Sequence, residues 1–393
     1  MTLAFPDDFH WGTSTAAAQI ETASDHQFRG LRARDGYLFE RTTDHERRRL
    51  ADVDLIARFG SVYRCGVDWA RLQSRPFAAF SRAVVGEYRE LFAALGGRGV
   101  RVMLVLHHFA HPRWFEEAGG FDYASNLTAF YDYCARCAEA FGDLVYAWNT
   151  FNEPNVYALN AYQQGIWPPY RKSVPAATRV LGHMARAHVH VYELLKGRFP
   201  GARVGYSLNT AYAEGRGLRG EATARFFDWW FYRRPVKLFR PVDFVGISYY
   251  AHLVFNPDPL TATEHAGELE RRGLPHDRMW ALKPEGLAYF VRRAHRDTGG
   301  QPVWVTENGV CTDDPQFRIR ILEQYLTGLH GCIREGIPVL GYTHWSPWDN
   351  FEWDLGPTYR FGLLHLDLAT MERHNTPAAD WYERVCDDNA LQL

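Results

Sequence analysis

Short apolar runs rich in β-branched and aromatic residues recur along the chain, and each is followed by a polar or glycine-containing loop and then by a segment with helical spacing. Runs of this kind favour strands, whereas apolar positions three and four residues apart favour helices. The pattern predicts strands at residues 9–15, 62–69, 100–108, 147–153, 203–209, 244–250, 302–309 and 339–346. Between them it predicts helices that include residues 45–60, 85–99, 175–199 and 317–336, the last closed by a glycine.

Eight strands alternating with helices in a chain of 393 residues predict an α/β protein with a (β/α)8 TIM barrel, in preference to an open doubly wound sheet. The composition stays even from end to end, without a low-complexity linker or an obvious internal repeat. We therefore expect residues 1–393 to form a single (β/α)8 catalytic domain.

Composition narrows the class of protein and of partner. With 46% hydrophobic and 15% aromatic residues the chain can bury a large core, so it is folded and globular. A formal net charge of −2 offers no electrostatic attraction for nucleic acid or an anionic membrane. The chain has neither a transmembrane-length apolar run nor a signal peptide pattern at its start, so we expect it to be soluble and cytoplasmic. The oligomeric state stays open.

Polar and ionisable residues gather where the predicted strands end. In a (β/α)8 barrel all those ends open on one face, where active sites are assembled. Residues far apart in sequence should therefore converge on one pocket. The residues concerned are His107 and His108, Asn152 and Glu153, Tyr249 and Tyr250, Glu307 and Asn308, and Trp345 and Ser346.

Two of these residues, Glu153 in AWNTFNEPNVY and Glu307 in VWVTENGV, suggest a reaction. Cleavage of a glycosidic bond needs one protonated carboxyl for the leaving oxygen and one ionised carboxylate to attack or stabilise an oxocarbenium-like carbon. Two adjacent carboxylates resist being charged together, which separates their pKa values. The residues alone leave open which glutamate has which role. The alternative to catalysis is that the two glutamates form structural ion pairs.

The motifs around these glutamates resemble family-1 glycoside hydrolases, the β-glucosidase family. FHWGTSTAAAQIE, YRCGVDWARL, LHHFAHPRW, TFNEPNVY, FVGISYY, VTENG, WSPWDNFEWDLG and YRFGLLHLD appear in the family's order over nearly the whole length. The resemblance implies a (β/α)8 barrel with Glu153 as acid/base and Glu307 as nucleophile. It also implies hydrolysis of a terminal β-linked sugar by double displacement through a covalent glycosyl-enzyme, with retention of configuration and carboxyl groups about 5–5.5 Å apart.

The resemblance assigns further roles by position. Arg64 lies beside the nucleophile, where a fixed guanidinium would keep Glu307 ionised. Tyr250 donates a hydrogen bond to the nucleophile, and Asn152 contacts the sugar 2-hydroxyl. Trp345 supplies the indole floor under the sugar. The residues that hydrogen-bond the remaining hydroxyls correspond to Gln19, His108, Glu352 and Trp353.

Several positions depart from the family pattern. Ser248 stands where the family has Asn, Ala110 where an acidic residue is usual, and Thr22 in place of Gly. Pro347 and Trp348 occupy positions where smaller or aliphatic residues are common. The loops after the first two strands are short, which suggests a more open cleft and a bulky or flat aglycone.

Other chemistries have weaker support. HHFAH offers three histidines that could bind a metal ion, namely His107, His108 and His111. Alternation along a strand, however, points the first two to opposite sides. Cys134 and Cys137 form a CxxC inside a helical segment without a second CxxC or a His pair nearby. GRGLRG, at residues 215–220, matches the GxGxxG pattern of dinucleotide-binding proteins, but it does not directly follow its predicted strand. We expect no metal ion or cofactor.

Two alternatives to hydrolysis remain. One is a transglycosylase that delivers sugar to an acceptor other than water, because water and alcohols would use the same residues. The other is a catalytically silent carbohydrate-binding barrel, which the presence of both glutamates disfavours. The expected ligand is a small-molecule β-glycoside or an oligosaccharide, and its gluco, galacto or fuco identity is not fixed by the motifs.

Overall fold

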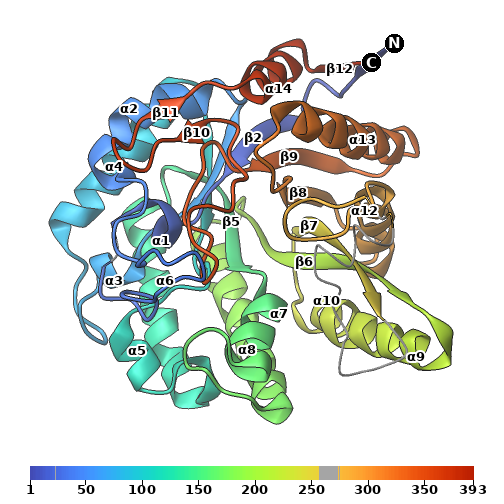
Figure 1. Cartoon of the computed structure of the whole chain (residues 1–393). Helices are drawn as coiled ribbons and strands as arrows, with labels where there is room; N and C mark the ends of the chain where they lie inside the picture. The colour runs from blue at the N-terminus through green and yellow to red at the C-terminus, as the bar shows by residue number, and fades with distance from the viewer. Residues whose placement is uncertain (23, 256–272, 274) are drawn as a thin grey trace.

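A closed ring of eight parallel strands forms the centre of the protein (Figure 1). The computed structural model describes residues 1–22, 24–255, 273 and 275–393. Neighbouring strands pair in chain order, and the last pairs with the first through His10–Ser14 and Gly341–Trp345. The strands are β2 (His10–Ser14), β3 (Val62–Gly66), β4 (Arg101–Val105), β5 (Val145–Asn152), β6 (Arg203–Gly215), β7 (Phe244–Phe255), β8 (Val303–Asn308) and β9 (Val339–Trp345). All eight predicted strands are present, so the predicted (β/α)8 barrel is confirmed.

Helices cover the outside of the ring (Figure 1). The longer ones are α2 (His45–Ala57), α4 (Arg82–Gly97), α6 (Leu127–Phe141), α8 (Val174–Arg198), α9 (Gly217–Asp228), α12 (Glu285–Asp297), α13 (Pro315–Arg334) and α14 (Pro377–Asp388). The four predicted helices are α2, α4, α8 and α13. The start of α13 is two residues earlier than predicted because the Asp314 carboxylate accepts a hydrogen bond from the amide of Gln316, with Pro315 in the first turn.

Short elements complete the fold. β1 (Thr2–Ala4) pairs antiparallel with β12 (Ala390–Gln392), so the two ends of the chain lie together (Figure 1). The others are α1 (Ala17–Ile20), α3 (Trp69–Leu72), α5 (Arg113–Glu117), η1 (Gly120–Asp122), η2 (Ala124–Asn126), α7 (Pro154–Tyr157), η3 (Ala158–Gln164), η4 (Trp229–Arg233), α10 (Arg234–Leu238), β10 (His365–Leu366) and β11 (Arg373–His374). Among the described residues no helix is both long enough and apolar enough to cross a bilayer.

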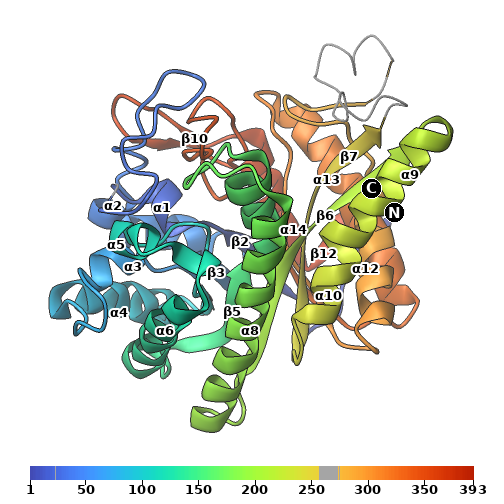
Figure 2. The same cartoon turned by 90° about the horizontal axis from the view of Figure 1, so that it is seen from below.

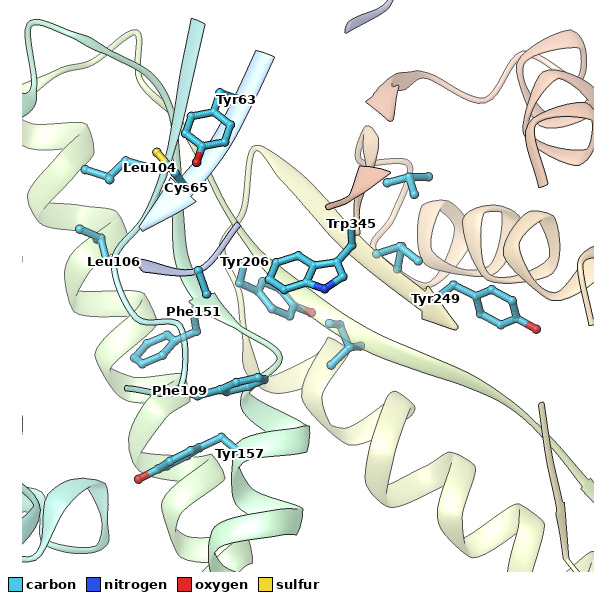
Figure 3. Close-up of a cluster of buried hydrophobic side chains, with 14 of the residues drawn as sticks. Tyr63, Cys65, Leu104, Leu106, Phe109, Phe151, Tyr157, Tyr206, Tyr249 and Trp345 are labelled. Atoms are coloured by element: carbon cyan, nitrogen blue, oxygen red, sulfur yellow. The ribbon is translucent and has the colours of Figure 1, made fainter. Parts of the chain in front are cut away.

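The apolar core occupies two places. One part lies between the strands and the helices. Its buried side chains include Leu104 of β4, Leu106 of the loop after β4, and Phe151 of β5 (Figure 3). A separate buried cluster consists of Val62, Met103, Ala147, Phe244 and Trp304. Val62 lies two residues before Arg64 on β3 and therefore shares its inward face. The amino-terminal half of the barrel interior is thus filled with apolar side chains, and polar inward side chains follow towards the carboxyl ends.

The strands β6 and β7 continue past the point where the sequence predicted their ends. Residues Ala211–Gly215 pair with Ala251–Phe255 as a two-stranded extension, and α9 packs against it (Figure 2). The prediction stopped at Asn209 and Tyr250 because polar residues there resembled loop starts. It was also wrong about GRGLRG: β6 runs to Gly215 and α9 begins at Gly217, so this segment does follow its strand directly.

Candidate active site

Both predicted catalytic glutamates line one cavity at the carboxyl ends of the strands. The cavity has a volume of about 500 Å³. Seven of the ten predicted site residues line it, namely His108, Glu153, Tyr250, Glu307, Trp345, Glu352 and Trp353. The other three, Gln19, Arg64 and Asn152, are fully buried and hydrogen-bond to residues of the cavity wall.

Glu307, the penultimate residue of β8, is held by a cation and a phenol. Nη1 of Arg64 donates to its Oε1 at 2.6 Å, and the hydroxyl of Tyr250 donates to its Oε2 at 3.0 Å. Burial raises the pKa of Glu307 above its ordinary value, and the charge and hydrogen bonds of Arg64 and then the hydrogen bond of Tyr250 counteract part of that rise. These partners favour the ionised carboxylate, in which both oxygens accept hydrogen bonds.

Arg64 itself is fixed in its orientation by side chains from several strands. Its Nη1 also donates to Oγ of Ser14, at 2.8 Å. Its Nη2 donates to Oδ1 of Asn152 at 2.6 Å and to Oγ of Ser207 at 3.1 Å. The guanidinium is fully buried. Its planar fork therefore ties β2, β5 and β6 to the carboxylate on β8 in one arrangement.

Glu153 follows β5 in a different environment. Its φ is 40°, in the left-handed region, which costs a residue with a Cβ roughly 1 kcal/mol or more. Its amide donates to the carbonyl of Ser207 at 2.8 Å, and its Oε1 accepts from Nδ2 of Asn209 at 3.0 Å. Burial, and then the negative charge of Glu307, raise the pKa of Glu153 to about 8. Its carboxyl therefore holds a proton at neutral pH.

The two carboxyl groups are thus electrostatically unequal. Glu307 receives a direct hydrogen bond from the Arg64 guanidinium, whereas the Glu153 side chain accepts a hydrogen bond from the neutral amide of Asn209. Because a buried pair of carboxylates disfavours double ionisation, the single proton resides on the member without the cation. The geometry places that proton on Glu153.

Another part of the cavity wall combines flat aromatic surfaces with hydrogen-bonding groups. His108 lies with its ring centroid 5.6 Å from that of Trp345 and 6.0 Å from that of Trp353. Nε2 of Gln19 lies 3.2 Å from Oε2 of Glu352. Burial, and then the charge of Glu307, raise the pKa of Glu352 to about 8. Within the described part of the chain, Nδ1 of His108 and Oε1 of Gln19 have no hydrogen-bond partner.

The positions that departed from the family pattern differ in their relation to the site. Ser248 is buried on β7, and its side chain faces the Glu153 carboxyl, whose pKa it lowers slightly against the effect of burial. The amide contact to Glu153 comes instead from Asn209 on β6. Ala110 does not line the cavity.

The sequence reasoning did not select Asn209, Ser14 or Ser207, although these residues contact Glu153 or Arg64. Asn209 ends the predicted strand at residues 203–209, so the rule that found the other polar strand ends would have found it. Ser14 and Ser207 lie inside the predicted strands at residues 9–15 and 203–209, where small polar residues give no pattern.

The weaker motifs lie elsewhere in the fold. His107 packs against aromatic rings outside the barrel, including Phe121 and Phe151, whereas His108 lines the cavity, so the two do point to opposite sides. Cys134 and Cys137 are buried on α6, where burial raises the pKa of both thiols and leaves them unreactive. No group of three or more potential ligand side chains is arranged to hold a metal ion within residues 1–22, 24–255, 273 and 275–393.

The sequence matches known proteins over nearly its whole length. The sequence model described as glycosyl hydrolase family 1 matches residues 1–229 and 235–391. Beta-glucosidase A of Thermotoga maritima is 26% identical over 444 aligned positions that cover 99% of each chain. A rice protein named probable inactive beta-glucosidase 14 is also 26% identical, over 99% of this chain and 92% of its own.

A solved structure shows the same fold. The beta-glycosidase from Pyrococcus horikoshii superposes with a TM-score of 0.89 at 28% sequence identity, covering 100% of this chain and 97% of the other. The family match therefore extends over sequence and fold together. The protein belongs to glycosyl hydrolase family 1 and is an enzyme that acts on O-glycosyl bonds, as the order of its motifs predicted.

Proposed function

We propose that the protein is a retaining β-glycosidase of the β-glucosidase type, with Glu307 as nucleophile and Glu153 as acid/base. The observation that carries the proposal is that the surroundings of the two buried carboxyls favour different protonation states. Glu307 is hydrogen-bonded by Arg64 and Tyr250, whereas Glu153 has a pKa of about 8. A retaining mechanism needs this division between an ionised nucleophile and a protonated acid.

In the first step the Glu307 carboxylate attacks the anomeric carbon of the bound glycoside while Glu153 donates its proton to the leaving oxygen. The bond from the sugar to the aglycone breaks, and an ester bond from the sugar to Glu307 forms. Formation of the ester removes the charge of Glu307. Because that charge raises the pKa of Glu153, its removal lowers this pKa and prepares Glu153 to accept a proton.

In the second step Glu153 takes a proton from a water molecule, whose oxygen attacks the anomeric carbon. The ester bond breaks, Glu307 recovers its charge, and the sugar leaves with its original configuration. Two displacements at one carbon give net retention. Arg64 and Tyr250 restrain Glu307 through both steps, and in this proposal Asn152, which is held by Arg64, contacts the 2-hydroxyl.

The sugar is assigned to the side of the cavity formed by His108, Trp345, Glu352 and Trp353, with Gln19 behind it. The unpartnered nitrogen of His108 and oxygen of Gln19 supply a donor or acceptor for hydroxyl groups. The indole of Trp345 supplies an apolar face for the ring. This mixture of flat and hydrogen-bonding surfaces suits a neutral hexose.

A panel of aryl β-glycosides, with the product anomer followed by NMR, tests the proposal. We expect release of the phenol and initial formation of the β-anomer of the sugar. Initial formation of the α-anomer would contradict the retaining mechanism. Binding without release would support the silent barrel, and a transfer product with added alcohol that exceeds hydrolysis at low alcohol concentration would support a transglycosylase.

A further inference from the structure

The cavity extends beyond the two glutamates along an apolar wall. This wall, which we call the α9 wall, is contributed by α9, η4 and the extended part of β7. Its residues that line the cavity are Phe226, Phe227, Trp230, Leu253 and Phe255. The α9 wall exists because β6 and β7 stay paired past the barrel and α9 packs against this extension (Figure 2).

The α9 wall lies on the leaving-group side of the site. Asn209, which hydrogen-bonds Glu153, is two residues before Ala211, where the β6 extension begins and which also lines the cavity. The acid/base residue must face the leaving oxygen. The surface next to Glu153 therefore receives the aglycone, whereas Gln19, Trp345 and Glu352 come from elements on the sugar side.

The aromatic part of the α9 wall is ordered by its own packing. The ring of Phe227 stacks on that of Phe231 with centroids 4.6 Å apart and lies 5.4 Å from that of Phe255. Phe226 lines the cavity yet is 58% exposed. A large apolar side chain left in solvent at the mouth of a cavity, next to packed aromatic rings, is typical of a ligand-binding surface.

The chemistry of the α9 wall favours an apolar aglycone over a second sugar. A sugar bound there would need hydrogen-bond partners for its hydroxyls. Thr223, the polar residue of α9 that lines the cavity, already donates its hydroxyl to the carbonyl of Arg219. Polar groups that line the cavity, such as Gln163 and Gln164, lie on η3 instead.

We propose that the α9 wall selects β-glycosides whose leaving group is an extended or bulky hydrocarbon, such as an alkyl chain or a fused ring. This inference rests on the proposed glycosidase function and adds the class of leaving group. The cavity volume of about 500 Å³ falls in the range of roughly 300–1,000 Å³ that encloses ligands larger than one hexose. The sugar occupies the part near Glu307, and the hydrocarbon occupies the part along α9.

The test is the dependence of kcat/KM on chain length for n-alkyl β-glucosides from methyl to octyl, with cellobiose as the disaccharide. Burying one methylene is worth about a fourfold gain, so we expect kcat/KM to rise by up to about that factor per carbon once the chain reaches the α9 wall. The kcat/KM for octyl glucoside should exceed the kcat/KM for cellobiose. A flat series, or a preference for cellobiose, would overturn the inference while leaving the glycosidase function intact.

Matched variants locate the effect on the α9 wall. Phe226→Ser should lower the ratio of octyl to methyl kcat/KM by about tenfold, because the exposed ring loses its contact with the chain. Leu218→Ser is the control, since Leu218 lies on α9 itself, is 88% exposed and does not line this cavity. An unchanged ratio in Phe226→Ser and Leu253→Ser would overturn the assignment.

A binding measurement separates this inference from the proposed reaction. Calorimetry with octyl and methyl thioglucosides needs no turnover. We expect octyl thioglucoside to bind at least tenfold more tightly, with a more negative heat capacity change, because apolar surface is buried. Equal affinities would refute the α9 wall as a hydrocarbon site even if no glycoside were hydrolysed. Failure to hydrolyse any substrate, with this difference preserved, would refute only the proposed reaction.

Discussion

Nη1 of Arg64 lies 2.6 Å from Oε1 of Glu307, and both side chains are almost completely buried. A buried ion pair of this kind is stable only when its other hydrogen-bonding groups are also paired. Here Ser14, Asn152 and Ser207 accept the remaining donors of the two terminal nitrogens, and Nε is the one guanidinium donor without a partner among the described residues. The relationship favours the ionised form of Glu307 against the effect of burial, which raises its pKa.

Arg64→Lys tests whether the geometry of the fork matters in addition to its charge. An ammonium cannot bridge Glu307 and Asn152 as a planar guanidinium does, so we expect a loss of about 100-fold or more in kcat/KM. The carboxylate of Glu307 should also become less stable, which raises its pKa and moves the acidic limb of the pH profile upward. Arg89→Lys, at a surface pair with Asp143, is the control and should leave both quantities unchanged.

Glu307→Gly should abolish turnover and leave the fold intact, because the nucleophile is lost while the apolar core of the barrel is untouched. Steady-state assays with aryl β-glycosides and circular dichroism spectra measure the two outcomes. Glu117→Gly, at an exposed glutamate, controls for the substitution itself. Undiminished activity in Glu307→Gly would refute its role as nucleophile.

The pH profile should report the proton on Glu153. The free enzyme needs this carboxyl protonated, so kcat/KM should fall as the pH rises through about 8. The hydrogen bond from Asn209 stabilises the ionised form and lowers this pKa. Asn209→Ala should therefore move the basic limb to higher pH. A shift in the opposite direction would mean that Asn209 supports the protonated form.

The folding stability of the protein should depend on pH because of the same raised pKa of Glu153. The pKa of Glu153 is about 8 in the folded chain against an ordinary value of 4.5. As the pH rises between these values the unfolded chain loses the proton first, so this residue's contribution to folding stability decreases. Glu153→Gln should thus stabilise the protein little below pH 4.5 and most above pH 8.

Thermal unfolding across this range, with Glu117→Gln as the exposed control, measures the difference. A gain in melting temperature for Glu153→Gln that does not change with pH would show that burial of the carboxyl does not raise its pKa as described.

Much of the fold was accessible from the sequence because the barrel repeats a local pattern. Each strand is a short apolar run, and residues such as Glu153 and Glu307 stand where the runs end. The limits of β6 and β7 were not accessible in this way. Asn209 and Tyr250 are polar, but they lie inside strands whose pairing continues for several residues beyond them.

The sequence by itself determined the order of strands and helices, the position of both glutamates at strand ends, and the family. Only the tertiary structure decided which carboxyl carries the proton and which residues hold the Arg64 guanidinium in place. It alone placed α9 beside the cavity. The reason is that periodicity and motifs depend on neighbours along the chain, whereas pKa values, hydrogen bonds and cavity walls depend on groups that only the closed barrel brings within a few ångströms.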